Sequence, residues 1–191
     1  EIYSAMDVYG LLTYENGRVF IPNKELMGSY AAMMKKEKSL GYIYRLANLS
    51  EQMLQATLAG DTGTMTQIIQ YAHNTEVPIL SYNNETELSA IVNLVYLSAR
   101  DRYRVEREDR AGKGYVDFIF YPLRADQDGI ILELKVNQTP DDAIAQIKER
   151  EYALRFKGKL AEKTVHTGRI LAVGIGYNKV TKEHACKVEE L

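Results

Sequence analysis

The hydrophobic positions of this chain follow two different patterns, and the change between them falls near residue 84. Before it, the dipeptide Asn16-Gly17 predicts a tight turn between two strands, because both residues tolerate positive φ. Apolar residues then recur at the spacing of short amphipathic helices. The elements expected here are strands at 8–13 and 18–21, and helices at 23–37, 50–58 and 62–73. Residues 1–80 are therefore predicted to form a hairpin plus a mainly helical linker section.

From residue 84 onward, helical and strand patterns alternate in the order α-β-β-β-α-β. The first helix is expected at 85–99, with Leu88, Ile91 and Val95 on its buried side. The other elements are strands at 103–108, 115–121, 129–136 and 169–177, and a helix from Thr139 or Pro140 to about 156. Helices bracketing a sheet, with a crossover into the last strand, indicate an α/β layered domain with a mixed sheet. We expect this domain at residues 81–191.

The predicted strand at 129–136 carries two opposite charges where an apolar strand should have none. Glu133 and Lys135 share one face with Ile131, because successive side chains of a strand alternate between faces. The other face is apolar throughout: Ile130, Leu132, Leu134 and Val136. Such a strand belongs in the centre of a sheet, where an unpaired charge is costly. One interpretation is a structural ion pair at a strand edge, and the other is a functional site.

Asp117 strengthens the functional interpretation. It lies on the preceding predicted strand, opposite the apolar face of Phe118 and Phe120. If the two strands form an antiparallel pair, Asp117 comes close to Glu133. Two converging carboxylates suit a hard cation such as Mg²⁺ or Mn²⁺. Such an ion would activate water and polarise a phosphate, and Lys135 would stabilise the developing charge.

The run GYVDFIFYPLRADQDGIILELKV, residues 114–136, resembles the D-x(n)-E-x-K signature of PD-(D/E)XK nucleases, including its apolar flanks. The predicted order of elements also resembles the restriction-endonuclease-like core of that superfamily. The resemblance implies a Mg²⁺-dependent (or Mn²⁺-dependent) nuclease that hydrolyses phosphodiester bonds, with DNA as the expected substrate. In this interpretation Asp117 and Glu133 bind the metal and Lys135 assists catalysis.

A second resemblance covers nearly the whole chain. The segments LLTYENGRVFIPNKEL and QIKEREY resemble the C-terminal region of uncharacterised bacterial AAA-ATPase-like proteins, which carry a nuclease-like domain after an ATPase domain. This implies an upstream ATPase domain that is absent from the present chain. The sequence itself contains no G-x-x-x-x-G-K-[ST] motif, so we expect no ATP site in it.

The superfamily resemblance also suggests residues that support the site. Glu87 matches the acidic residue of the first core helix as a metal ligand, although a solvated Glu in a first helical turn is an equal alternative. Gln146 resembles the Gln that follows the E-x-K strand. Arg150 lies one turn later on the same face, whereas Tyr152 lies six residues on and departs from the Gln–Tyr spacing of some relatives. We expect Tyr152 to pack in the core with Phe156.

Charge and composition limit the remaining possibilities. The net charge is −2, divided as −4 over residues 1–99 and +2 over residues 100–191, which permits phosphate binding without requiring it. Lys113, Lys148 and Arg150 are the candidate nucleic-acid contacts, and a solvated helix face is the alternative for the last two. A nuclease-like fold that binds nucleic acid or a protein partner without cutting is therefore the second functional hypothesis.

The remaining features concern location and the end of the chain. The single Cys186 favours a reducing compartment, so a cytoplasmic location is expected, and the apolar runs are too short to span a bilayer. With His184 it lies in what is expected to be a free tail rather than a zinc site. An oligomer is compatible with everything above.

Overall fold

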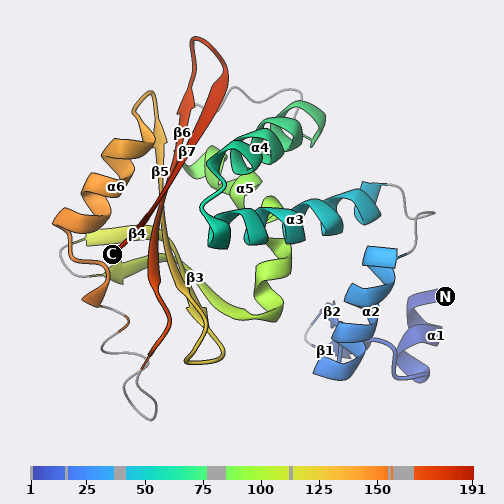
Figure 1. The fold of residues 1–191 in the computed structure, drawn as a ribbon. Helices are drawn as coiled ribbons and strands as arrows, with labels where there is room; N and C mark the ends of the chain where they lie inside the picture. Colours follow the sequence, from blue (N-terminus) through green and yellow to red (C-terminus); the bar gives the residue numbers. More distant parts are fainter. Residues whose placement is uncertain are drawn as a thin grey trace. The chain divides into compact units, whose positions relative to one another are not determined.

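A computed structural model describes residues 2–15, 17–36, 42–76, 85–111, 114–154, 156 and 166–191. The chain divides into two compact units, Glu1–Asn48 and Leu49–Leu191. Figure 1 shows the elements of each unit. None of the helices in the described part of the chain is long and apolar enough to cross a membrane.

The first unit contains helix α1 (Ile2–Val8), a hairpin of β1 (Thr13–Glu15) and β2 (Arg18–Phe20), and helix α2 (Lys24–Lys36). The turn at Gly17 has the predicted positive φ of 78°, while Asn16 lies outside the described residues. The strand predicted at 8–13 is wrong. Gly10 follows α1 with a φ of 69°, and the N–H groups of Gly10 and Leu11 donate to the carbonyl oxygens of Asp7 and Met6. This segment is therefore the end of a helix.

The second unit begins with helices α3 (Tyr42–Ala59, whose first residues belong to the other unit) and α4 (Thr62–Glu76). Asp61 caps α4 by accepting a hydrogen bond from the N–H of Thr64 at 3.0 Å. Both helices bury side chains in the same core as the sheet, among them Met53, Leu54, Met65 and Ile69. The second compact unit starts at Leu49, because the apolar faces of α3 and α4 are covered by the sheet. The boundary expected from the sequence lies after residue 80.

A five-stranded mixed sheet forms the centre of the second unit. Its strands are β3 (Tyr103–Ala111), β4 (Gly114–Pro122), β5 (Gly129–Val136), β6 (Ile170–Asn178) and β7 (Glu183–Glu190), in that spatial order. β5 and β6 are parallel, and all other neighbours are antiparallel. The free tail expected at 178–191 is wrong: its alternating residues form β7, which pairs along all of β6 from Leu171 to Asn178.

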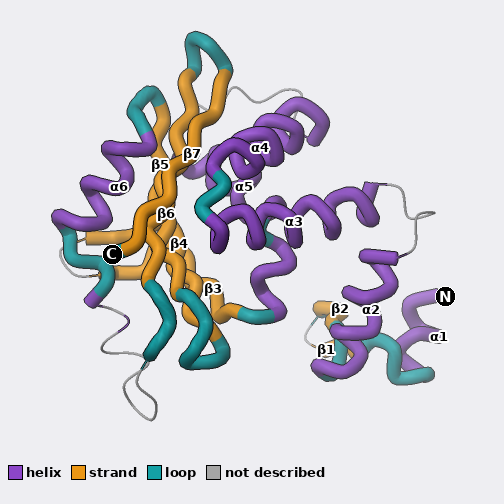
Figure 2. The backbone as a smooth tube through the Cα atoms, viewed as in Figure 1, coloured by secondary structure: helices purple, strands orange, loops and turns teal. Residues whose placement is uncertain are grey.

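Helices cover both faces of the sheet (Figure 2). Helix α5 (Glu85–Val95) and the short 3₁₀ helix η2 (Leu97–Asp101) pack with α3 and α4 on one face. Helix α6 (Pro140–Glu149) packs on the other face, over Ile119, Ile131 and Ala172. This is the α/β architecture predicted from the sequence, with the order α-β-β-β-α-β extended by one strand.

Helix α6 ends earlier than predicted. Its last hydrogen bonds are made by the N–H groups of Arg150 and Glu151, and Glu151 has a left-handed φ of 55° that stops the helix. The segment that follows turns Tyr152 and Phe156 into the core beneath α6, where both side chains are almost fully buried. The expected core position of Tyr152 is thereby confirmed.

Candidate active site

The site forms where strands β4 and β5 separate. Their paired register runs from Phe120–Ile130 to Phe118–Leu132 and goes no further. At the next position the side chain of Asp117 takes the place of a backbone partner, because its Oδ2 accepts a hydrogen bond of 2.8 Å from the N–H of Leu134. This bond fixes the Asp117 carboxylate beside β5, at the level of Glu133.

Glu133 and Lys135 project from β5 toward α6 and are buried to an unusual degree for charged residues. They are 4% and 9% exposed, respectively. The Lys135 ammonium lies 3.4 Å from Glu133 Oε1. The strand parity predicted from the sequence thus brings Asp117, Glu133 and Lys135 together on one face of the sheet.

Two glycines of the neighbouring strand make room for this arrangement. Gly174 and Gly176 of β6 lie in register with Glu133 and Lys135. A Cβ at Gly174 would come within 2.3 Å of the carbonyl oxygen of Pro140, at the start of α6. The missing side chains let α6 begin directly against the sheet, next to the two charged residues.

The first turn of α6 is fixed by a reciprocal cap. Thr139 Oγ1 accepts from the N–H of Asp142, and Asp142 Oδ2 accepts from the N–H of Thr139 at 2.8 Å. The Thr139 hydroxyl, which donates to Asp142 Oδ2 at 2.7 Å, and the N–H of Thr139 hold the pKa of Asp142 below its ordinary value. A helix secured at its N-terminus presents its later turns to the sheet in a defined orientation.

Gln146 connects α6 to both charged residues of β5. Its amide nitrogen donates to Glu133 Oε1, and its amide oxygen accepts from Lys135 Nζ at 2.8 Å. The two contacts use opposite ends of one amide, so they define its orientation. Asp117, Glu133, Lys135 and Gln146 therefore form one continuous polar cluster under α6.

The electrostatics of this cluster centre on Glu133. Burial raises the pKa of the Glu133 carboxyl to about 7, and the neighbouring Asp117 carboxylate contributes in the same direction. Lys135 opposes the increase but does not cancel it. A glutamate that shares its site with a second carboxylate is poised to exchange its proton for a cation.

The donor set fits a divalent metal ion. Glu133 Oε2 is buried and has no hydrogen-bond partner among the described residues, and the charge of Asp117 acts on the same carboxyl group. A cation between these carboxylates would satisfy this oxygen and relieve their repulsion. The described side chains contain no group of three His, Cys, Asp or Glu residues suited to a metal. Water and substrate oxygens would supply the remaining ligands, as is usual for Mg²⁺.

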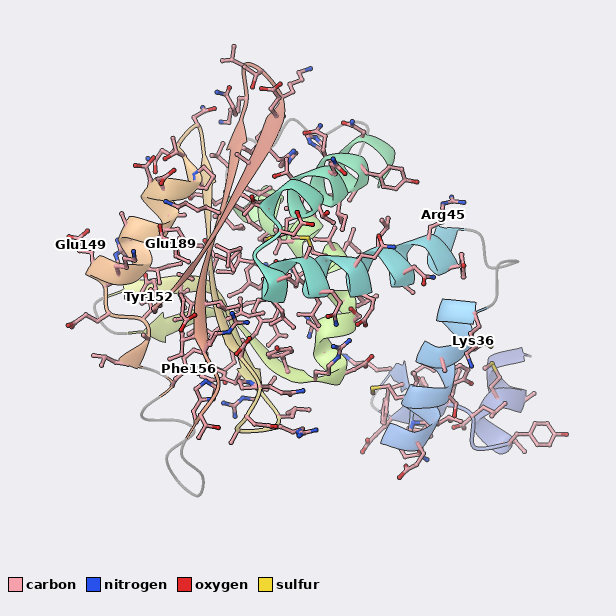
Figure 3. The ribbon with its side chains drawn as sticks, viewed as in Figure 1. Lys36, Arg45, Glu149, Tyr152, Phe156 and Glu189 are labelled. Atoms are coloured by element: carbon pink, nitrogen blue, oxygen red, sulfur yellow. The ribbon has the colours of Figure 1, made fainter. Side chains whose placement is uncertain are left out.

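The other predicted site residues have different outcomes. Glu87 lies in α5, but its side chain is outside the described part, as is Lys113. Lys148 extends toward β7, where its ammonium pairs with Glu189 (Figure 3 labels Glu189 beside α6). Arg150 follows the last residue of α6, one turn after Gln146.

Sequence reasoning missed the capping pair of α6 and the two glycines of β6. Both left a signal. The run Thr139-Pro140-Asp141-Asp142 has the spacing of a capping box, and the alternation Gly174-x-Gly176 within an apolar strand marks a close approach of another backbone.

A sequence model of the PD-(D/E)XK nuclease superfamily matches residues 83–181, a little over half of the chain. The fold and the Asp117, Glu133 and Lys135 arrangement agree with this match, and the chain belongs to the PD-(D/E)XK nuclease superfamily. No curated protein matches the chain. Strand β7 and helices α3 and α4 lie outside the matched range, although they complete the core around it.

Proposed function

We propose that this protein is a Mg²⁺- or Mn²⁺-dependent nuclease that hydrolyses phosphodiester bonds in DNA. The observation that carries the proposal is the cluster of Asp117, Glu133 and Lys135, because its two carboxylates and one ammonium lie together on one face of the sheet, with Glu133 and Lys135 buried. A purely structural ion pair would not require the second carboxylate, whose repulsion raises the pKa of Glu133.

Each residue has a distinct part in this proposal. Asp117 and Glu133 would hold the ion, which when bound supplies charge stabilisation to the phosphate and acidity to a water. Lys135 has three N–H bonds and directs two toward Glu133 and Gln146, so a third can reach a substrate oxygen or the attacking water. Gln146 orients Lys135 and Glu133 through its two amide contacts.

We also propose that the nuclease acts in the cytoplasm together with an upstream ATPase domain. The support is the resemblance of residues in both units to AAA-ATPase-like proteins, together with a single cysteine that needs no oxidising compartment. The ATPase would load or translocate the nucleic acid that the nuclease cuts.

The test measures cleavage and metal binding together. We expect the wild type to cut linear double-stranded or single-stranded DNA with Mg²⁺ or Mn²⁺, and Mn²⁺ to raise its melting temperature by binding only the folded state. Glu133→Gln should remove both effects. Glu149→Gln, on the exposed part of α6, is the matched control and should retain them. A wild type that is inactive on DNA and RNA and insensitive to Mn²⁺ would favour a module that binds without cutting.

A further inference from the structure

The end of helix α6 places a cation beside the candidate site. Arg150 is the residue after the helix, and its N–H donates to the carbonyl oxygen of Gln146 at 3.0 Å. Residues four apart lie on the same side of a helix. Arg150 therefore continues the face on which Gln146 contacts Glu133.

Among the described residues, the side chain of Arg150 is anchored on one side only. Its Nη1 donates to the hydroxyl of Tyr152 at 3.4 Å, and the ring of Tyr152 is fully buried in the core beneath α6. Figure 3 labels Tyr152 in this position after the helix. A guanidinium has five N–H donors, so this single contact fixes its position and leaves most of them for another acceptor.

Arg150 differs from several of the other arginines in what surrounds it. Arg102, Arg124 and Arg169 each form an ion pair with a carboxylate. Within the part of the chain that the structure describes, no carboxylate lies within ion-pair distance of Arg150. The hydroxyl of Tyr152 is the main cause of the raised pKa of Arg150, and the charges of Glu133 and Glu149 add to it.

Before a metal ion binds, the charges of the site oppose the entry of an anionic substrate. Asp117 and Glu133 with Lys135 sum to one negative charge when both carboxylates are ionised, which opposes a phosphodiester. Arg150 brings this sum to zero. Lys148 cannot replace it, because its ammonium is engaged by Glu189 and its position on α6 is two residues from Gln146, on a different side.

We propose that Arg150 is a substrate-positioning residue, and this proposal rests on the proposed function. Arg150 binds the phosphate of the nucleic-acid strand that is next to the phosphate cleaved at Glu133. Four residues of helix rise amount to about 6 Å, so Arg150 lies beyond the point of cleavage rather than at it. The planar guanidinium can bind two phosphate oxygens at once, which would fix the strand's register relative to Glu133.

The first experiment compares DNA binding by whole-chain variants in the Glu133→Gln background, which prevents cleavage. Arg150→Gln should weaken binding of a fluorescent oligonucleotide about tenfold. It should also lower the slope of log Kd against log salt by about one. Arg124→Gln removes the same charge from the loop at the other end of β4 and should change neither quantity. Arg150→Lys should keep the salt slope but recover only part of the affinity.

The second experiment identifies the phosphate. Single methylphosphonate linkages, which are neutral, are placed one at a time along the oligonucleotide. One position should weaken binding in the Arg150 protein and have no effect in Arg150→Gln, because the contact is already lost. Equal penalties at every position in both proteins, equal affinities of Arg150→Gln and Arg124→Gln, or no binding by the parent protein would each overturn the inference.

Failure of the proposed function gives a different result. The wild type could neither cut nucleic acid nor respond to Mn²⁺ while oligonucleotide binding still depends on Arg150. This result would refute the proposed hydrolysis and support the phosphate contact of Arg150. The opposite result is cleavage that requires Glu133 but has the same KM and kcat in wild type and Arg150→Gln. It would support the proposed nuclease activity and refute the phosphate contact of Arg150.

Discussion

Ionisation of Glu133 should make the folded state less stable as the pH rises from 4.5 to about 7. The pKa of this carboxyl is about 7 in the folded protein, against 4.5 ordinarily. A carboxyl with a raised pKa binds its proton more tightly in the folded state, so its contribution is complete below about pH 4.5 and is lost toward about pH 7. The difference of 2.5 pH units corresponds to about 3 kcal/mol of unfolding free energy.

The assay is urea unfolding of wild type and Glu133→Gln between about pH 5 and about pH 8, without divalent ions. Glutamine keeps the size and polarity of the side chain but cannot ionise. The free energy of unfolding of the wild type should therefore fall relative to that of the variant by about 2.5 kcal/mol across this range. The comparison is between proteins at each pH because other groups also titrate, and Glu149→Gln serves as the control at an exposed position.

Two outcomes would refute the reasoning. A constant difference between wild type and Glu133→Gln at all pH values would mean that the carboxyl is ionised throughout, as in a structural ion pair with Lys135. A variant that is less stable than wild type at about pH 8 would lead to the same conclusion, because Lys135 would then have lost a needed partner. Addition of Mn²⁺ should stabilise the wild type at high pH only, where the carboxylate is available.

Three further predictions concern the same domain. Asp117→Asn removes the charge that adds to burial in raising the pKa of Glu133, so the fall in stability of Asp117→Asn should be smaller and should end at lower pH in the same urea titration, and cleavage should be lost. Gly174→Ala should lower the free energy of unfolding by about 1–3 kcal/mol, because the new Cβ meets the backbone where α6 begins. Gly63→Ala at the surface of α4 should be neutral or stabilising, and thermal or urea unfolding measures both variants. Burial, together with the neighbouring His73, lowers the pKa of His184 to about 4. The wild type should therefore lose stability as the pH falls from 6.5 to about 4, and His184→Phe should remove this loss. The same loss of stability in His184→Phe as in the wild type would contradict this.

The sequence predicted the central strands and the convergence of Asp117 with Glu133 because both depend on local alternation. β5 was expected at 129–136 and extends over those residues, and the side-chain faces followed from its period of two. The contacts of Gln146 with both Glu133 and Lys135 could not be predicted in this way. They depend on how closely α6 approaches β5, which is set by glycines on a third element.

The errors arose where tertiary context overrides a local pattern. The strand at 8–13 is predicted from the Asn16-Gly17 turn that follows it, but a positive φ at Gly10 ends a helix there. The segment around His184 and Cys186 is predicted to be a free tail, because no other histidine has a spacing that suits a zinc site with them. It forms β7 because an edge strand needs only one apolar face, and β6 offers it a complete row of backbone partners. The end of α6 at Glu149 depends on the left-handed Glu151, which is not a residue type that usually marks such a turn.

The pairing of β7 with β6 limits where this protein can be truncated. A domain cut at residue 181, where the superfamily match ends, would lack β7 and leave the backbone of β6 open to solvent. All residues of β6 from Leu171 to Tyr177 are buried, so the new edge would be flat, long and apolar. Such an edge recruits strands from other molecules, and the truncated domain would aggregate instead of remaining a soluble nuclease core.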